Sequence, residues 1–437
     1  MNKLVRVFVS APAVVLFAAL LISVTGCGQD VAEDLEPYDP DREYTISIGA
    51  FGELEDAYTA VAETDEFQER FPNVELEFQT ADFDGHHERL TTTIAAGEAT
   101  NHIESLEVEF IAQFVEGGGL YDLSQEPFNG FEAGEGIVDF AMANATTFDD
   151  RLVAMPVDIA PAVLFYRADM VEEAGISEEE MQNISDWDEF IEIAEALTKD
   201  TNDDGTIDQF ALPTAAEVAD VPIGGGKGGW IDEDGEPLQP RERFTEVLEL
   251  VQSVRQAGVD ADLGAWSEEW VQAFSDGTVA MTANGAWFGG ALQTWIAPDV
   301  EDWRVAHLPE YASIGGTYLS IPETVPSDKV LPAWEVIEFL TTHPEAQLTT
   351  FRTIDAFPAL TEVFDDEVMD EEVEYYGGQQ VRQIFAEVSE NHPILNVSEF
   401  DAEIVGIWGT VVSGVIEGDL TIEEAYDQAL QQVRGIM

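Results

Sequence analysis

Apolar and polar positions alternate along two short stretches early in the chain. Residues 44–48 read Tyr-Thr-Ile-Ser-Ile and residues 74–78 read Val-Glu-Leu-Glu-Phe. A period of two is typical of a β-strand with one buried face. Between them, residues 54–71 carry apolar side chains at helical spacing, and the Phe-Pro-Asn segment at 71–73 ends that helix. This order predicts a right-handed βαβ unit with parallel strands.

Helical periodicity returns further along the chain. Residues 186–197 place their apolar side chains on one helix face, with Ser185 as the expected N-cap and Asp188 three residues later. Residues 404–433 predict two helices joined at the Glu-Gly-Asp segment 417–419. No internal repeat is apparent. The sequence therefore predicts an α/β protein, long enough for more than one lobe.

The N-terminus has the order of residues typical of a secretory signal. Lys3 and Arg6 precede an almost wholly apolar run at 7–24, and the only cysteine, Cys27, follows. The four residues ending at Cys27 (Val-Thr-Gly-Cys) resemble a bacterial lipobox, in which the cysteine is lipidated, although Val24 replaces the usual leucine. The alternative is an uncleaved transmembrane anchor. Both interpretations place the remaining chain outside the cytoplasm.

The first 42 residues are thus expected to lie outside the folded part. Residues 1–26 are predicted as a lipoprotein signal peptide, and residues 27–42 as a flexible acidic tether without apolar periodicity. No other segment is long and apolar enough to span a membrane. A lone cysteine cannot form an internal disulfide.

The net charge of the chain limits the classes of function that it can have. The chain has 17 Lys and Arg against 89 Asp and Glu, a formal charge of −72. A hydrophobic fraction of 45% and nine tryptophans nevertheless indicate a folded protein. Acids scattered through every segment favour adaptation to high salt, which screens their repulsion. The alternative, mimicry of nucleic acid or binding of a basic partner, requires a concentrated patch. The sign of the charge argues against nucleic-acid binding.

Catalytic motifs are scarce. There is no Gly-x-Ser-x-Gly elbow, no His-Glu-x-x-His and no P-loop. Gly224, Gly226 and Gly229 match Gly-x-Gly-x-x-Gly, but without a convincing strand before and helix after, so a glycine loop is the better interpretation. Among 89 acids no pair stands out as a glycosidase pair. The histidines, including His86 and His87, lack metal-ligand spacing and are expected at the surface.

Several segments in a fixed order carry a family resemblance. They are residues 155–169 (Met-Pro-Val-Asp-Ile-Ala-Pro-Ala-Val-Leu-Phe-Tyr-Arg-Ala-Asp), 173–176, 186–190, 274–287, 315–316 and 333–341. Together they resemble the extracellular solute-binding proteins of ABC importers, in the large sugar-binding family typified by maltose-binding protein. The resemblance extends from Tyr44 to the C-terminus.

This resemblance implies a two-lobed periplasmic-binding-protein-like fold of type II, with hinged lobes and a central ligand cleft. The N-terminal lobe would comprise 43–156 plus 305–325, and the C-terminal lobe 157–304 plus 326–437. Crossings between lobes are expected near 155–160, 305–309 and 324–328.

Trp287 is the first candidate for contact with the solute, because the family's Asn-Gly-x-Trp segment presents an aromatic ring to a sugar. A pyranose has apolar C–H faces for stacking and hydroxyls that need fixed partners. The alternative is a core tryptophan. The carboxylates Glu53, Glu109 and Asp158 are candidate hydroxyl acceptors, with the solvated surface as their alternative.

The secondary candidates are Tyr318, Trp230 and Trp266. Where the maltose-type cleft has a second stacking tryptophan, this chain has Val405 or its neighbours, which disfavours a maltose-like ligand.

The segment 200–208 resembles a calcium loop, since oxygen ligands alternate along it and a glycine allows a sharp turn. An EF-hand is rejected because Ala211 stands where its glutamate is required. Some family members hold a structural calcium after this helix, which would assign the ligands Asp200, Asn202, Asp204, the Thr206 carbonyl and Asp208. The alternative is an empty acidic turn.

The resulting functional prediction is a non-enzymatic receptor, monomeric and anchored by lipid at the outer face of the cytoplasmic membrane. It would capture a mono- or oligosaccharide and deliver it to an ABC-type permease, with no required cofactor. Two alternatives remain open. One is a binding protein for a polyol, a glycerol phosphate derivative or an osmolyte, and the other is an extracellular carbohydrate-active enzyme.

Overall fold

The computed structural model describes residues 35–437 except 148, 226–228, 233–234, 396–397 and 399. The predicted signal peptide, the lipobox with Cys27 and the first part of the tether lie outside the described residues. Among the residues that are described, no helix combines the length and apolar character needed to cross a bilayer.

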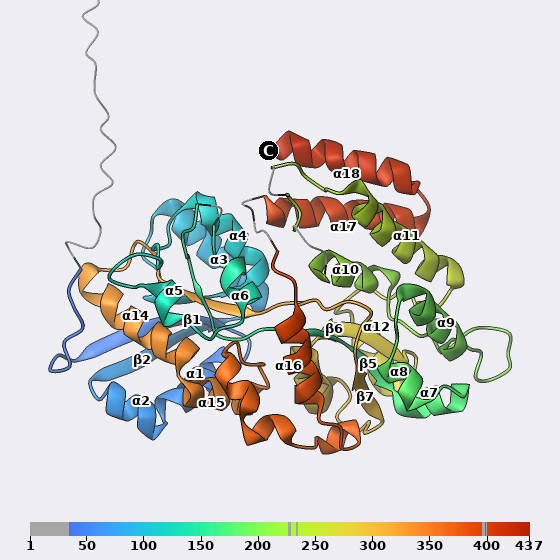
Figure 1. Cartoon of the computed structure of the whole chain (residues 1–437), viewed down its shortest axis with the longest axis horizontal. Coiled ribbons are helices and arrows are strands. Elements are labelled where there is room, and N and C mark those ends of the chain that lie inside the picture. The colour runs from blue at the N-terminus through green and yellow to red at the C-terminus, as the bar shows by residue number, and fades with distance from the viewer. Residues whose placement is uncertain (1–34, 148, 226–228, 233–234, 396–397, 399) are drawn as a thin grey trace, which may run out of the picture. The chain divides into compact units, whose positions relative to one another are not determined.

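The strands form two separate sheets (Figure 1). The first has the order β2-β1-β3-β8-β4 and the second the order β6-β5-β7. The strands of the first sheet are β1 (Tyr44–Phe51), β2 (Val74–Ala81), β3 (Ile103–Glu107), β4 (Met155–Pro156) and β8 (Thr317–Ser320). Those of the second are β5 (Ala162–Arg167), β6 (Met281–Gly285) and β7 (Trp303–Ala306). Two sheets, each carrying helices, make up the two lobes of the expected α/β fold.

The predicted βαβ unit is confirmed. β1 and β2 run parallel, from the pair Tyr44 and Val74 to the pair Phe51 and Ala81. The single helix expected between them is instead two helices, because the side chain of Thr64 accepts the Phe67 N–H and starts a new helix there. These helices are α1 (Leu54–Ala62) and α2 (Asp65–Arg70).

Further helices accompany the first sheet. They are α3 (Phe83–Ala96), α4 (Val108–Gly117), α5 (Gly130–Ala133), α6 (Asp139–Asn144), α14 (Ser327–Thr342) and α15 (Pro344–Ile354). Helix α15 packs against α1, and α14 packs against β1 and β4 (Figure 1). The sequence predicts residues 326–437 in the second lobe. Residues 327–354 instead belong with the first sheet, because α14 packs on β1 and β4 while α15 packs on α1 and α14.

The remaining helices accompany the second sheet. They are α7 (Ala168–Ala174), α8 (Glu178–Gln182), α9 (Trp187–Leu197), α10 (Asp220–Gly225), α11 (Arg241–Ala257), α12 (Glu268–Asp276), α13 (Trp287–Ala291), α16 (Val381–Asn391), α17 (Asp401–Glu417) and α18 (Ile422–Ile436). A short 3-10 helix, Ala215–Ala219, precedes α10. Short 3-10 turns also cover Thr361–Asp365, Glu367–Asp370 and Glu374–Tyr376, and a π-turn covers Leu292–Ile296.

The structure corrects the predicted cap of one helix and confirms the last two helices. Asp186, rather than Ser185, caps α9 by accepting the Glu189 N–H. The last two helices, α17 and α18, are confirmed and pack on each other.

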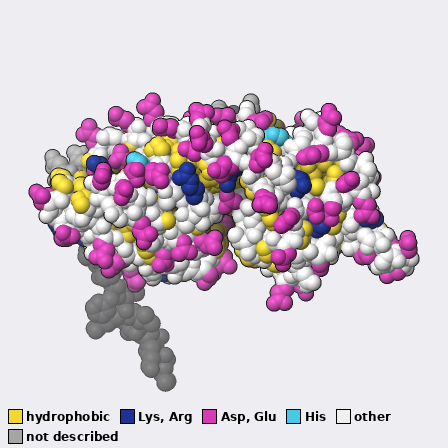
Figure 2. Space-filling view, turned by 90° about the horizontal axis from the view of Figure 1, so that it is seen from below, with side chains coloured by type: hydrophobic (Ala, Val, Ile, Leu, Met, Phe, Trp, Pro, Cys, Tyr) yellow, Lys and Arg dark blue, Asp and Glu magenta, His cyan; other side chains and the backbone are white. Residues whose placement is uncertain are grey.

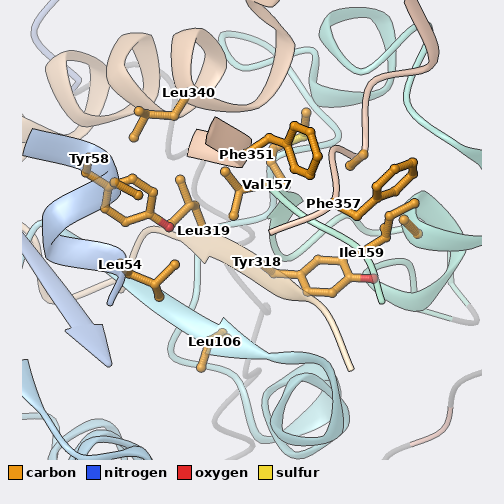
Figure 3. Packing of buried hydrophobic residues seen from close by; sticks show 14 of the residues in the cluster. Leu54, Tyr58, Leu106, Val157, Ile159, Tyr318, Leu319, Leu340, Phe351 and Phe357 are labelled. Carbon is orange, nitrogen blue, oxygen red and sulfur yellow. The ribbon is translucent and has the colours of Figure 1, made fainter. Parts of the chain in front are cut away.

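The apolar core continues into the segment that joins the sheets. Figure 3 shows Val157 and Ile159, just after β4, among side chains from β8 and α15, including Leu319 and Phe351. Burial of this kind stabilises the segment by roughly 1.5–3 kcal/mol for each large apolar side chain. The joining segment is thus anchored by packing on the first lobe.

Candidate functional site

Two segments carry the chain between the sheets and are hydrogen-bonded to each other. Residues 157–161 lead from β4 to β5, and residues 307–316 lead from β7 to β8. Ile314 N–H donates to the Ala160 carbonyl at 2.8 Å, and Ala162 N–H donates to the Ala312 carbonyl at 2.9 Å. These paired segments form a hinge region, and the candidate site is built around them.

Asp158 lies in this hinge region. Its side chain is only 8% exposed, and its Oδ1 accepts the Thr317 N–H at 3.0 Å. Burial is the main cause that raises its pKa to about 6, although the hydrogen bonds from Thr317 oppose the shift. Thr317 begins β8, so this hydrogen bond holds the segment after β4 to the segment that leads into β8.

Glu107 is a second acid beside the hinge region, and it is not among the residues predicted from the sequence. It ends β3 and caps α4, since its Oε2 accepts the Glu109 N–H at 2.8 Å. Burial, then the charges of Glu109 and Asp158, raise its pKa to about 8. One signal could have identified it: the carboxyl ends of strands in open α/β sheets face the ligand crevice.

Three more acids extend the group across both lobes. Glu109 lies in the first turn of α4, whereas Asp220 opens α10 beside the second sheet. Burial, together with the charge of Glu109, raises the pKa of Asp220 to about 6. Asp220 is exposed at the surface, but the protein atoms around it displace part of its water and disfavour its charge.

Glu217 lies in the 3-10 helix before α10 and is bonded to β6. Its Oε1 accepts the Ala283 N–H at 2.6 Å and the hydroxyl of Thr282. Burial raises its pKa to about 8. Helix α4 also contacts α17 of the other lobe. The first lobe thus contacts the second at α4, and the charge of Glu109 on α4 acts on Asp220 of the second lobe.

Trp287 also lies beside the hinge region. Its Nε1 donates to the Ile314 carbonyl at 3.0 Å, so the indole is fixed to the hinge region. Gly315, at φ +107°, lies close to both Trp287 and Glu107: an added Cβ would lie 3.4 Å from both Glu107 Oε1 and Trp287 Nε1. At Gly285 an added Cβ would lie 2.6 Å from the Ile314 carbonyl oxygen, so glycine permits this close approach.

Trp266 enlarges the aromatic surface. Its ring stacks on Trp287 with centroids 5.7 Å apart and planes 23° apart. It is 55% exposed and has a φ of +64°, which is uncommon for a large side chain and occurs at functional sites. The two indoles form a partly exposed wall of the kind that stacks on sugar rings.

A second aromatic group lies at the carboxyl ends of β1 and β3. The His87 ring stacks on the Phe110 ring with centroids 4.0 Å apart, and its centroid lies 4.9 Å from that of Phe51. Its Nε2 accepts the Glu107 N–H, so Nδ1 carries the proton and donates to the Phe83 carbonyl. Burial lowers the pKa of His87 to about 4.

The expected surface position of His86 and His87 is therefore wrong, because α3 turns both rings inward. The aromatic side chains Phe51, Phe83 and Phe110 were also missed. Each lies next to a strand end or a helix start, which is the signal that could have identified them.

The other predicted site residues are spread more widely. Tyr318 is 1% exposed and lies beside Ile159 in the core (Figure 3). Glu53 is exposed at the start of α1. Trp230 stacks on Phe244 in the second lobe, 5.8 Å away. Val405, on α17, is 46% exposed. Of the predicted ligand residues, the hinge region thus gathers Trp287, Trp266, Asp158 and Glu109.

Glu107 should make stability depend on pH. Its pKa rises from the usual 4.5 to about 8 in the folded protein, so the folded state holds the extra proton between these values. Stability should therefore fall as pH rises through this window. We expect Glu107→Gln to have a smaller drop in melting temperature between pH 5 and pH 8 than the parent. Glu242→Gln, at an exposed position on α11, is the control; an equal drop in all three proteins would contradict the prediction.

The segment 200–208 uses its acids to hold its own backbone. Asp200 Oδ2 accepts the Gly205 N–H at 2.6 Å, and Asp208 Oδ1 accepts the Thr201 N–H at 2.7 Å. Within the described part of the chain, no group of three or more His, Cys, Asp or Glu is placed to hold a metal ion. Calcium binding therefore stays a prediction from the sequence pattern.

Comparison with known proteins gives a consistent result. Residues 62–376 match the family model of bacterial extracellular solute-binding proteins. An arabinooligosaccharide-binding protein of Halalkalibacterium halodurans is 21% identical over 85% of each chain. A lactose-binding protein of Rhizobium radiobacter is 24% identical over 66% of this chain and 69% of its own.

The fold agrees with these matches. A crystal structure of a family 1 extracellular solute-binding protein superposes with a TM-score of 0.78 at 23% identity, over 90% of this chain and 99% of the other. The family and these relatives are binding proteins rather than enzymes. The chain, with its two sheets joined by a paired hinge region, belongs to the bacterial extracellular solute-binding protein family.

Proposed function

We propose that this protein is a lipid-anchored receptor that captures a carbohydrate and delivers it to an ABC-type permease, working as a monomer at the outer face of the cytoplasmic membrane. The observation that carries the proposal is the Trp287 and Trp266 wall beside the carboxyls of Glu107 and Asp158. Stacking surface next to hydrogen-bonding oxygens is what a sugar ring requires. The two relatives named for oligosaccharide and lactose binding support the same class of solute.

A thermal-shift screen tests this proposal. The chain lacking residues 1–27 would be measured in molar KCl with calcium, against mono- and oligosaccharides, polyols, glycerol phosphates and betaine. A ligand at 100 times its dissociation constant should stabilise the fold by about 2.7 kcal/mol. A shift with a saccharide that is recovered unchanged supports a receptor. A shift with betaine or a polyol alone, or turnover of the saccharide, would reject it.

Lipid anchoring is tested through Cys27. We expect the full chain to partition with membranes and Cys27→Ser to be released in soluble form with unchanged solute binding, since one cysteine carries the lipid. Membrane and soluble fractions would be compared by immunoblot. Retention of the serine variant in the membrane fraction would favour an uncleaved apolar anchor instead.

The calcium loop is proposed as a structural site that supports the second lobe. If the predicted oxygens of Asp200, Asn202, Asp204, Thr206 and Asp208 turn toward the ion, calcium at 100 times its dissociation constant should stabilise the fold by about 2.7 kcal/mol. Chelator should lower the melting temperature of the parent but not of Asp208→Asn. If chelator does not change the melting temperature of the parent, the loop is an acidic turn without calcium.

A further inference from the structure

Three phenylalanines gather at one edge of the first sheet. Phe51 ends β1, Phe83 follows β2 by two residues, and Phe110 follows β3 by three. Because β1 runs parallel to both β2 and β3, the carboxyl ends of these strands lie at the same edge. The centroid of the Phe83 ring lies 5.4 Å from that of Phe51 and 5.8 Å from that of Phe110. The three side chains form a phenylalanine cluster.

His87 holds the phenylalanine cluster in place. Its ring stacks on Phe110 with planes 13° apart and contacts Phe83, with centroids 4.7 Å apart. The imidazole is itself fixed at both nitrogens, by the Phe83 carbonyl at 2.8 Å and the Glu107 N–H at 3.1 Å. Rings that are fixed before binding lose little side-chain freedom when a ligand stacks on them. The cluster is therefore preorganised as a stacking surface.

The phenylalanine cluster keeps accessible apolar surface. Phe83 is 37% exposed, and Phe51 and Phe110 are half-buried. Exposed apolar side chains that lie next to one another are typical of binding sites, whereas scattered ones are normal. Asp84 and Glu109, the sequence neighbours of two of these rings, are exposed carboxylates, and carboxylates accept hydrogen bonds from hydroxyls. Apolar rings bordered by hydroxyl acceptors suit a sugar ring.

Glu107 connects the phenylalanine cluster to the tryptophan wall of Trp266 and Trp287. Its N–H donates to His87, which supports the cluster. Its carboxyl lies beside the hinge region, where a Cβ added to Gly315 would be 3.4 Å from both Glu107 Oε1 and the Trp287 indole nitrogen. The carboxyl ends of strands in open α/β sheets face the ligand crevice. One residue thus links two stacking surfaces, the cluster on the first lobe and the tryptophan wall on the second.

We propose that the solute is an oligosaccharide of two or more units, with one ring stacked on the tryptophan wall and another on the phenylalanine cluster. This inference rests on the proposed carbohydrate-binding function and narrows its substrate class. Once the first ring is bound, a linked ring reaches the second surface at a high effective concentration. Affinity should therefore rise steeply with the unit that reaches the cluster, whereas a monosaccharide uses only the tryptophan wall.

Saccharide series of one to four units test the inference: α-1,4- and β-1,4-linked glucose, β-1,4-linked galactose, β-1,4-linked xylose and α-1,5-linked arabinose. Binding would be measured by titration calorimetry in molar KCl, on the chain used for the thermal-shift screen, with competition titrations for weakly bound monosaccharides. In the series that binds most tightly, we expect an oligosaccharide to bind at least tenfold more tightly than its monosaccharide.

Variants of Phe83, the most exposed ring of the cluster, identify the second surface. Phe83→Ala and Phe83→Leu should each weaken that oligosaccharide by about tenfold, which corresponds to about 1.4 kcal/mol, because both remove the flat face. Phe83→Tyr keeps the face and should bind within threefold of the parent. None should weaken the monosaccharide, and the backbone carbonyl that holds His87 is present in all three.

Phe131→Ala is the matched control. Phe131, on α5, is 43% exposed, and its ring makes no aromatic contact within the described part of the chain. Its replacement should leave the affinities for the oligosaccharide and the monosaccharide unchanged. Circular dichroism would show that each variant is folded.

The outcomes separate the inference from the receptor proposal. If a monosaccharide binds as tightly as its oligomers, the inference fails and the carbohydrate receptor stands. The same holds if folded Phe83→Ala binds the oligosaccharide as the parent does, because the second ring then lies elsewhere. Equal losses for both ligands would place the first ring on the cluster and overturn the inference. If no saccharide binds to folded protein, the receptor proposal fails and the inference with it.

Discussion

Trp287→Ala is expected to weaken solute binding by about 100-fold, because the substitution removes both the stacking face and an anchor of the hinge region. Tryptophan is among the residues whose truncation costs about 2 kcal/mol or more at a binding site, and 100-fold corresponds to about 2.7 kcal/mol. The indole also donates its N–H to the Ile314 carbonyl, so alanine releases the crossing segment beside it. Calorimetric titration with the ligand found in the thermal-shift screen measures the loss.

The chain offers matched tryptophans for this experiment. Trp295 is 53% exposed, and its side chain makes no ring stacking or hydrogen bond within the described part of the chain, so Trp295→Ala should bind as the parent does. Trp266→Ala should fall between the two, since Trp266 contributes surface next to Trp287 but no anchor. Circular dichroism would show that each variant is folded. A folded Trp287→Ala variant that binds within threefold of the parent would contradict the assignment of the site.

The sequence predicted local structure better than it predicted which parts pack together. The strands at residues 44–51 and 74–81 follow from alternation alone, because alternate side chains are buried along the first part of β1 and half-buried along β2. The break at Thr64 depends on one hydroxyl reaching one N–H, which periodicity does not record. Residues 327–354 show that a helical pattern reveals an apolar face without revealing which sheet will cover it.

The candidate site was only partly predictable for a related reason. Trp287 and Asp158 stand in segments that resemble a known family, so their positions could be expected. Glu217 and Asp220 are two acids among 89, and nothing in their local sequence separates them from surface acids, whereas Glu107 is marked only by its place at the carboxyl end of β3. What distinguishes them is the loss of surrounding water and the nearness of other acids, and both arise only in the tertiary fold.

Lowering the salt concentration should destabilise the whole protein. Acidic side chains are scattered over the whole face in Figure 2, with few basic ones between them, and the formal charge is −72. The Debye length grows from about 3 Å at 1 M salt to about 30 Å at 0.01 M, so distant acids begin to repel one another. We expect the melting temperature to fall by roughly 10 °C on transfer from 2 M to 10 mM KCl, which corresponds to a few kcal/mol.

Ion pairs act in the opposite direction, since low salt strengthens them. The pairs here are mostly exposed, such as Arg241 with Asp427 and Arg434 with Glu236, and exposed pairs contribute only about 0–1 kcal/mol each. With 17 basic residues against 89 acids, most acids have no such partner, so repulsion should dominate. A melting temperature that is constant or higher at low salt would show that ion pairs stabilise the fold at least as much as acid repulsion destabilises it.

A charge-neutralised variant separates screening from other effects of concentrated salt. Four exposed glutamates without side-chain hydrogen bonds in the described structure can be changed to glutamine together: Glu66, Glu195, Glu249 and Glu362. Concentrated salt also strengthens apolar burial, and that contribution is the same in parent and variant. If repulsion is the cause, the variant loses less stability than the parent at 10 mM KCl and matches it at 2 M. Parallel curves would instead assign the salt requirement to apolar burial, because removing charge would then have changed nothing that salt screens.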